Sequence, residues 1–85
     1  MGTPRQKVGR LPDKLLQIRN TLGLSQSEMH RKLGVEDIVY NRISDYERGT
    51  REPPLKVLLR YARVSGVSME VLADDDMDLP KKFKR

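Results

Sequence analysis

Few side chains in this 85-residue sequence have the chemistry needed for covalent catalysis or metal binding. Cysteine is absent and His30 is the only histidine. Ser25, His30 and Asp37 show no spacing typical of a catalytic triad, and a zinc site would need more imidazole or thiolate ligands. We therefore expect no enzyme activity, no metal site and no cofactor.

An acidic cluster near the end of the chain is the remaining candidate for a hard cation. It contains Asp74, Asp75, Asp76 and Asp78. Carboxylates can hold such a cation, but a short acidic run is more typical of a solvated tail. A basic terminus follows, formed by Lys81, Lys82, Lys84 and Arg85. It would aid attraction to a polyanion or serve solubility alone.

The formal net charge is +5, and it is unevenly placed. Residues 1–10 carry Arg5, Lys7 and Arg10 and no acidic side chain. A basic balance favours polyanionic partners such as nucleic acids, although ordinary solubility also accounts for surface charge.

Nothing in the sequence predicts association with a membrane. No apolar run approaches the roughly 20 residues needed to span a bilayer, and residues 1–10 lack the apolar stretch of a signal peptide. The absence of cysteine fits a reducing compartment. We expect a cytoplasmic protein.

Glycine and proline divide the middle of the chain into five short helical segments. They are residues 11–22, residues 25–33, a segment ending near Arg48, a segment from Pro54 to Gly66, and a short one after Ser68. No segment alternates as a half-buried strand does. The sequence predicts an all-α protein with a flexible basic arm (1–10), one domain (11–73) and a charged tail (74–85).

One apolar face of each helix is expected to build the core. The faces are Leu11, Leu15, Ile18 and Leu22; Met29 and Leu33; Val39, Ile43 and Tyr46; Leu55, Leu58, Leu59 and Ala62; and Met69 with Leu72. Ser25 and Glu28 have the spacing of a capping box, which predicts a helix beginning there.

Four motifs in order along the chain carry a resemblance to a known family. They are LSQSEM (24–29), LGV (33–35), ISDYERG (43–49) and REPPL (51–55), followed by Ala62, GVS (66–68) and Leu72. Over residues 13–73 the chain resembles the phage-repressor/Cro family of helix-turn-helix proteins. The resemblance implies a compact five-helix bundle whose third helix enters the major groove of DNA.

The resemblance also implies which residues meet the bases. It places Tyr40, Asn41, Arg42, Ser44 and Asp45 on the exposed face of the third helix. Arg42 is suited to guanine and Asn41 to adenine. Tyr40 would meet a thymine methyl group or a phosphate, and Asp45 would accept from cytosine or orient an arginine.

Further positions match the family's contacts to the DNA backbone and its internal ion pair. Gln26 would contact phosphate or brace the third helix, and Arg48, Thr50 and Arg51 would contact phosphates. Arg19 and Glu47 match positions that pair between the first and third helices.

The chain departs from the family between Val35 and Ile43. Seven residues lie there, where the family pattern has about four. The extra residues would lengthen the turn or start the third helix early, with Glu36 or Asp37 as a cap. His30 stands where the family usually has alanine, and we link the two departures: a longer connection would make room for the imidazole.

The function expected from the resemblance is a transcriptional regulator, most simply a repressor. As a homodimer it would bind double-stranded DNA at a two-fold operator, with half-sites about 10 base pairs apart. The alternative is an antitoxin or adaptor that pairs with a protein partner, such as a toxin or regulator. An apolar patch near Val64, Val67, Val71 and Met77 would serve either a partner or the homodimer.

Overall fold

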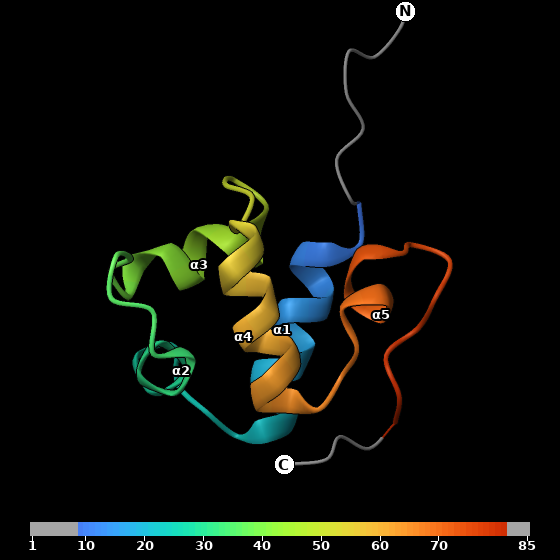
Figure 1. Cartoon of the computed structure of the whole chain (residues 1–85), viewed down its shortest axis with the longest axis horizontal. Helices are drawn as coiled ribbons and strands as arrows, with labels where there is room; N and C mark the ends of the chain where they lie inside the picture. Colours follow the sequence, from blue (N-terminus) through green and yellow to red (C-terminus); the bar gives the residue numbers. More distant parts are fainter. Residues whose placement is uncertain (1–8, 82–85) are drawn as a thin grey trace, which may run out of the picture.

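The computed structural model describes residues 9–81 and folds them into five helices, labelled in Figure 1. The bounds are α1 Leu11–Leu22, α2 Gln26–Leu33, α3 Asn41–Arg48, α4 Leu55–Ser65 and α5 Met69–Ala73. No strand occurs within residues 9–81, and the all-α prediction is confirmed. The expected basic residues Arg5, Lys7, Lys82, Lys84 and Arg85 lie outside the described part of the chain.

The predicted capping box fixes the start of α2. The Ser25 hydroxyl accepts a hydrogen bond from the Glu28 backbone N–H over 3.1 Å, and the Glu28 carboxylate accepts one from the Ser25 N–H over 2.7 Å. The backbone N–H of Ser25, together with its hydroxyl, lowers the pKa of Glu28. Two of the free N–H groups at the helix start are thereby satisfied.

A glycine ends α3 at a place where no side chain would fit easily. Gly49 has a φ of 79°, which favours glycine. A Cβ at this position would lie 3.2 Å from the Cγ atom of Pro12. The end of α3 therefore packs directly against the first turn of α1.

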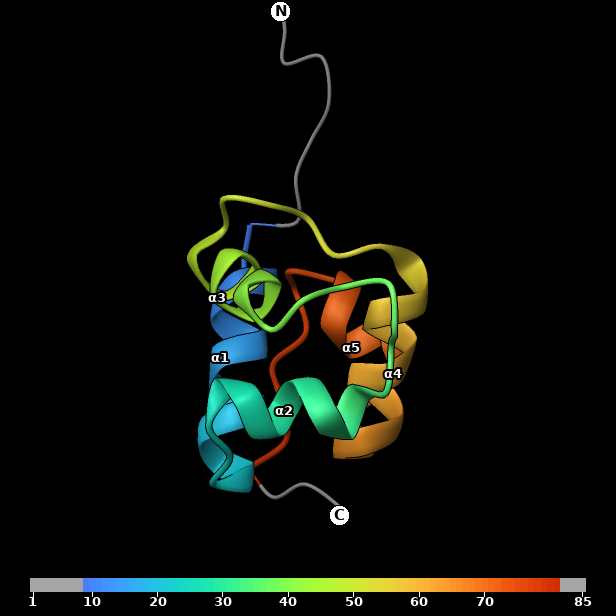
Figure 2. The ribbon, with the colours of Figure 1, turned by 90° about the vertical axis from the view of Figure 1, so that its left-hand side faces the viewer.

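The helices surround one shared core (Figures 1 and 2). α1 and α4 pack together in the middle, α2 and α3 lie on one side of them, and α5 lies on the other. The side chains almost completely shielded from solvent include Leu15, Ile18, Met29, Leu33, Ile43, Val57, Tyr61 and Leu72. Because all five helices contribute to it, this core fixes how α3 is held.

The predicted apolar face of α4 is partly wrong. Leu55 is 73% exposed and Leu59 is 38% exposed. The buried row consists instead of Val57, Tyr61 and Ser65, with Ala62 beside it. Both rows have helical spacing, so periodicity alone could not choose between them. The row that carries the large Tyr61 side chain faces the core.

The connection between α2 and α3, residues 34–40, is a lengthened turn and not an early start of α3. Asp37 does not cap a helix; its carboxylate accepts a hydrogen bond from Lys56 on α4 over 2.6 Å. Val39 precedes α3 and is 59% exposed, so its predicted place in the core is wrong. The added residues reach across to α4 and do not extend the helix.

His30 contacts this lengthened turn. Its Nε2 atom lies 2.7 Å from the Ile38 carbonyl oxygen, and because a carbonyl can only accept, the Nε2–H group donates. The imidazole is partly buried, as the hypothesis linking the longer connection to His30 requires.

Asp75 and Asp78 of the acidic segment are bonded to Gly9 and Arg10, directly before α1. The Asp75 carboxylate accepts the backbone N–H groups of Gly9 and Arg10 over 2.9 and 3.0 Å. The Arg10 guanidinium donates to the Asp75 carbonyl oxygen and to the Asp78 carboxylate, over 2.6 and 2.7 Å. Residues 9 and 10, placed in the basic arm by the sequence, are therefore held by the acidic segment.

Lys14 joins the same region from inside. Its side chain is almost completely buried, and the ammonium group donates to the carbonyl oxygens of Val71 and Asp74 over 2.6 and 2.8 Å. A cation at the end of α5 satisfies carbonyl groups that have no partner within the helix.

Among the described residues, no helix is long and apolar enough to cross a membrane.

Candidate nucleic-acid interface

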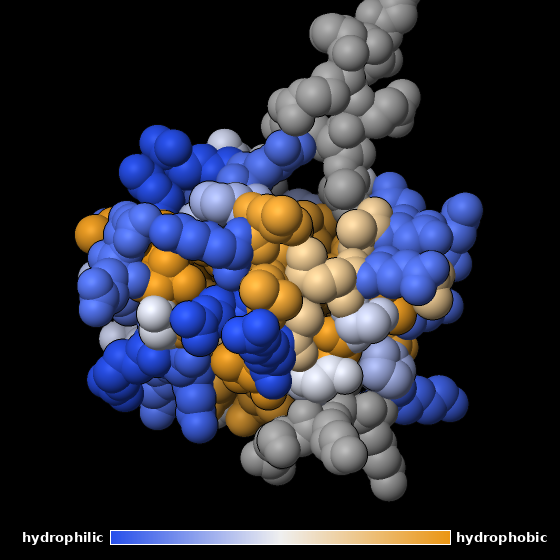
Figure 3. Space-filling model, viewed as in Figure 1, coloured by the Kyte–Doolittle hydropathy of each residue, from blue (hydrophilic) through white to orange (hydrophobic). Residues whose placement is uncertain are grey.

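α3 lies at an edge of the bundle with one side free. Its inner side buries Ile43 and Tyr46, while Tyr40 and Asn41 at its start are exposed and Ser44 is half-buried. Figure 3 shows hydrophilic residues gathered at the upper left, over α3 and the loop that follows it. The surface that α3 presents is therefore rich in hydrogen-bonding groups.

Asp45 organises the positive charges of this surface. Its carboxylate lies 3.3 Å from the Arg42 guanidinium, 3.0 Å from that of Arg48 and 3.5 Å from that of Arg51. The Thr50 hydroxyl donates to the Asp45 backbone carbonyl over 3.2 Å. One carboxylate thus gathers three arginines from the start of α3, its end and the following loop.

The environment of Asp45 keeps it ionised. Partial burial acts to raise the pKa of Asp45, but hydrogen bonds from Arg48 and Arg42 outweigh it and leave the pKa below its ordinary value. The side chain is only 20% exposed, whereas those of Arg48 and Arg51 are 65% and 56% exposed. The anion is therefore set back and the cations face solvent.

The loop after α3 folds back onto the helix end. The backbone N–H groups of Thr50 and Arg51 both donate to the Asp45 carbonyl oxygen, over 3.0 and 3.4 Å. This arrangement places the predicted phosphate-contacting residues Arg48, Thr50 and Arg51 together beside Asp45. A phosphate could meet more than one of them at once.

A partly buried ion pair braces α3 against α1. Arg19 donates to both carboxylate oxygens of Glu47, over 2.6 and 3.0 Å, and also to the Leu24 carbonyl oxygen over 2.9 Å. Gln26 donates to the same Glu47 carboxylate over 3.1 Å. The expected pair of Arg19 and Glu47 is thus in contact. Of the two roles expected for Gln26, phosphate contact and bracing of the third helix, its bond to Glu47 fits the bracing role.

The hydrogen bonds that Arg19 donates to Glu47 raise the pKa of Arg19, and burial opposes them less strongly. The guanidinium therefore stays charged, and this pair links α1, the start of α2 and the end of α3 through charged groups. Such a bidentate pair sets direction as well as distance. It joins the end of α3 directly to α1.

One known protein family shares this arrangement of helices. Residues 15–72, from α1 to α5, match the helix-turn-helix family. The chain belongs to the helix-turn-helix family of Cro/CI-type repressors and related regulators. No curated protein and no solved structure matches the chain.

As a helix-turn-helix protein, the chain is a DNA-binding transcription regulator. α2 and α3 form the helix-turn-helix pair, and α3 is the recognition helix, preceded here by a lengthened turn. The family is a regulatory one and in general not enzymatic. Among the described residues, no three His, Asp or Glu side chains are grouped as a metal site would need.

Two features of this helix-turn-helix surface were not predicted from the sequence. The first is that Asp45 contacts three arginines and not one, because Arg51 reaches it through the loop that folds back after α3, and this loop carries no periodic signal. The second is the exposure of Val39, whose spacing from Ile43 resembles that of a core residue. The seven residues between Val35 and Ile43 were the available indication that Val39 could lie outside the core, because they left the start of α3 undetermined.

Proposed function

We propose that the protein is a repressor that binds a two-fold operator as a homodimer. The observation that supports this most directly is the polar face of α3, held by the Arg19–Glu47 pair and carrying arginines arranged around Asp45. A rigid recognition helix with free polar side chains suits reading base edges in the major groove. Occupying an operator by this means blocks transcription without any catalytic step.

Base reading is assigned to the exposed start of α3. We propose that Asn41 pairs with adenine and that Arg42 donates to guanine O6 and N7, with Tyr40 and Ser44 contacting neighbouring positions. For Asp45 we propose the orienting role, since three arginines already engage its carboxylate.

Contacts to the DNA backbone are assigned to the other end of α3. We propose that Arg48, Thr50 and Arg51 bind phosphates, because they lie together in and beside the loop and two of them are exposed cations. Gln26 is proposed to brace α3 through Glu47 and to meet a phosphate from the start of α2.

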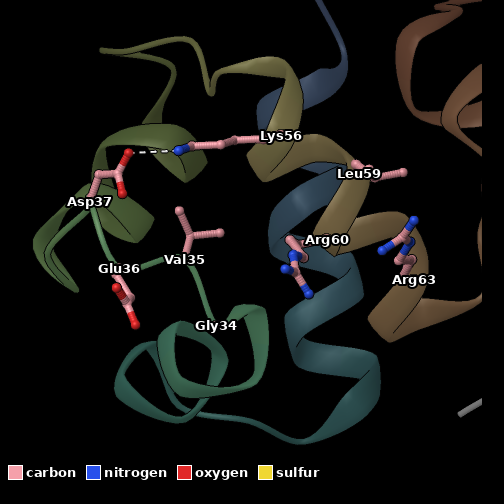
Figure 4. Close-up of a pocket in the computed structure, with 8 residues that line it drawn as sticks. All are labelled: Gly34, Val35, Glu36, Asp37, Lys56, Leu59, Arg60 and Arg63. Carbon is pink, nitrogen blue, oxygen red and sulfur yellow. Dashed lines mark hydrogen bonds and ion pairs between the residues drawn. The ribbon is translucent and has the colours of Figure 1, made fainter.

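The outer face of α4 is proposed as the surface through which two copies associate. Leu55 and Leu59 are exposed there, beside a hollow of about 290 Å³. Figure 4 shows Glu36 and Asp37 on one rim of the hollow, with Arg60 and Arg63 on α4 at the other. A two-fold axis would bring the acidic rim of one copy to the basic rim of the other, as an interface between identical surfaces requires.

The test is selection of bound sequences from a pool of random duplex DNA at near-physiological salt. We expect a short inverted repeat to be recovered, and Asn41→Ala with Arg42→Ala to abolish its enrichment. Arg31→Ala is the matched control, because it removes an exposed arginine of α2, away from α3 and from the α4 surface, and should leave the selected sequence unchanged. Recovery of unselected DNA alone would overturn the proposal.

The same α4 surface supports the second candidate, an antitoxin or adaptor that pairs with another protein. Exposed leucines beside charged rims suit a protein partner as well as a second copy. A monomer in solution that still selects one half-site would favour this alternative. A dimer that selects an inverted repeat would favour the repressor.

A further inference from the structure

Exposed large apolar side chains are few in the described part of the chain, and two of them stand directly ahead of α3. Val39 is 59% exposed and Tyr40 is 55% exposed. The others, Leu55 and Leu59, lie on α4. The exposure of these apolar side chains beside the polar groups proposed to read bases is not explained by polar contacts.

The segment that carries Val39 is anchored on both sides. Asp37 is bonded to Lys56 on α4 over 2.6 Å, and the Ile38 carbonyl oxygen accepts from His30 on α2 over 2.7 Å. Ile38 itself is partly buried and packs on the core. Val39 is thus pushed outward by a connection whose preceding residues are tied to α2 and α4.

The backbone of Val39 is also part of the start of α3. Its carbonyl oxygen accepts a hydrogen bond from the Arg42 N–H over 3.0 Å, and the Tyr40 carbonyl accepts from the Ile43 N–H over 3.0 Å. The Val39 backbone therefore keeps a fixed position relative to Asn41 and Arg42. The exposed Val39 side chain is thus carried within three residues of both, at the end of α3 proposed to read bases.

We infer that Val39 contacts the 5-methyl group of a thymine and so sets the base preference at one position of the half-site. This inference rests on the proposed function. The thymine methyl is the apolar group that base pairs expose in the major groove, and an aliphatic side chain without hydrogen-bonding capacity can recognise it only by contact. The lengthened connection thereby adds an apolar reader to the polar ones on α3.

The test replaces each thymine of the selected half-site in turn by deoxyuridine, which lacks only the methyl group. We expect the wild-type protein to bind about fourfold more weakly at one position, as loss of one buried methyl-sized contact implies. Val39→Ser should bind the thymine and deoxyuridine duplexes equally at that position, and Val39→Ile should restore the difference. Circular dichroism checks that the variants fold, which the exposure of Val39 favours.

The matched control is Leu55→Ser, which removes an exposed apolar side chain of α4. It should keep the fourfold ratio whatever it does to overall affinity. A wild-type protein indifferent to every thymine methyl, or a Val39→Ser variant that keeps the full loss, would overturn the inference while leaving sequence-selective binding intact. If no sequence is selected at all, the proposed function fails and the inference fails with it.

Discussion

Asp45 shows how one acidic residue can serve a surface that must bind a polyanion. Facing a phosphate alone, it would weaken binding by repulsion. Here it is largely covered and engaged by Arg42, Arg48 and Arg51, so its charge limits where these long side chains can go. Ordering the arginines before DNA arrives lowers the entropy lost on binding.

Substituting Asp45→Asn should therefore exchange selectivity for general affinity. The three arginines lose their common anion, so we expect stronger binding to random DNA and a smaller ratio of operator to random affinity. The slope of log K against log salt should become steeper by about one, because more positive charge faces the phosphates. Glu70→Gln on α5 removes the same charge far from α3 and should leave both quantities nearly unchanged. A variant whose selectivity ratio equals that of wild type would contradict the orienting role.

Arg42 and Arg51 share this anion and yet should differ in what they read. Arg42→Ala should cost about 1–3 kcal/mol of binding free energy on the operator and relax the preference at one base pair. Arg51→Ala should weaken binding to all sequences and flatten the salt slope by about one. Binding isotherms on the operator and on single-base variants, at several salt concentrations, separate the two. Equal weakening on every sequence by Arg42→Ala would make it a backbone contact.

Between elements, the Arg19–Glu47 pair joins α1 to the end of α3. Both side chains are largely covered, at 15% and 5% exposed, and removing one partner leaves a charge that water cannot fully reach. We expect Arg19→Ala to lower the free energy of unfolding by about 3 kcal/mol, measured by urea denaturation. Arg19→Lys should recover only part of this loss, because an ammonium cannot make the bidentate contact. Arg31→Ala, an exposed control on α2, should change stability by less than about 0.5 kcal/mol.

The bond from Asp75 to the start of α1 makes the fold sensitive to acid. The backbone N–H groups of Arg10 and Gly9 lower the pKa of Asp75 below its ordinary 3.8. A carboxyl whose pKa falls on folding stabilises the fold above its unfolded pKa, and the contribution disappears as the pH drops through the folded value. Asp75→Asn should therefore lower the thermal midpoint at neutral pH, and the difference from wild type should shrink below pH 3.8. A difference independent of pH would mean that the charge of Asp75 is not what matters.

The elements themselves were largely predictable, because their ends depend on local chemistry. The capping box at Ser25 and the glycine after α3 were read directly from the sequence and are present. The buried face of α4 was not, since the leucine row and the row carrying Tyr61 have the same period. Contacts that join distant segments, such as Asp75 with Arg10 and Asp37 with Lys56, follow from packing that no spacing rule describes.

At the scale of the whole molecule, one recognition helix covers only a few base pairs, so the proposed two-fold operator binding depends on the α4 surface proposed to join two copies. The apolar patch expected from the sequence near Val64, Val67 and Val71 is less available for binding another chain. Val67 is buried, and Val64 and Val71 are partly buried and pack against the core. Leu55 and Leu59, on α4, remain exposed. Burying a leucine side chain is worth about 1.5–3 kcal/mol.

Substituting both leucines by serine should therefore break the proposed dimer. We expect Leu55→Ser with Leu59→Ser to raise the dimer dissociation constant by at least about tenfold in sedimentation equilibrium, since each copy loses apolar contact at the interface. Tyr40→Ser removes another exposed large side chain, from the side proposed to face DNA, and should leave the dimer constant unchanged. The variant with both leucines replaced should still bind a single half-site, because α3 and the Arg19–Glu47 pair are untouched. It should lose the extra affinity for the inverted repeat. An unchanged dimer constant would move the interface away from α4.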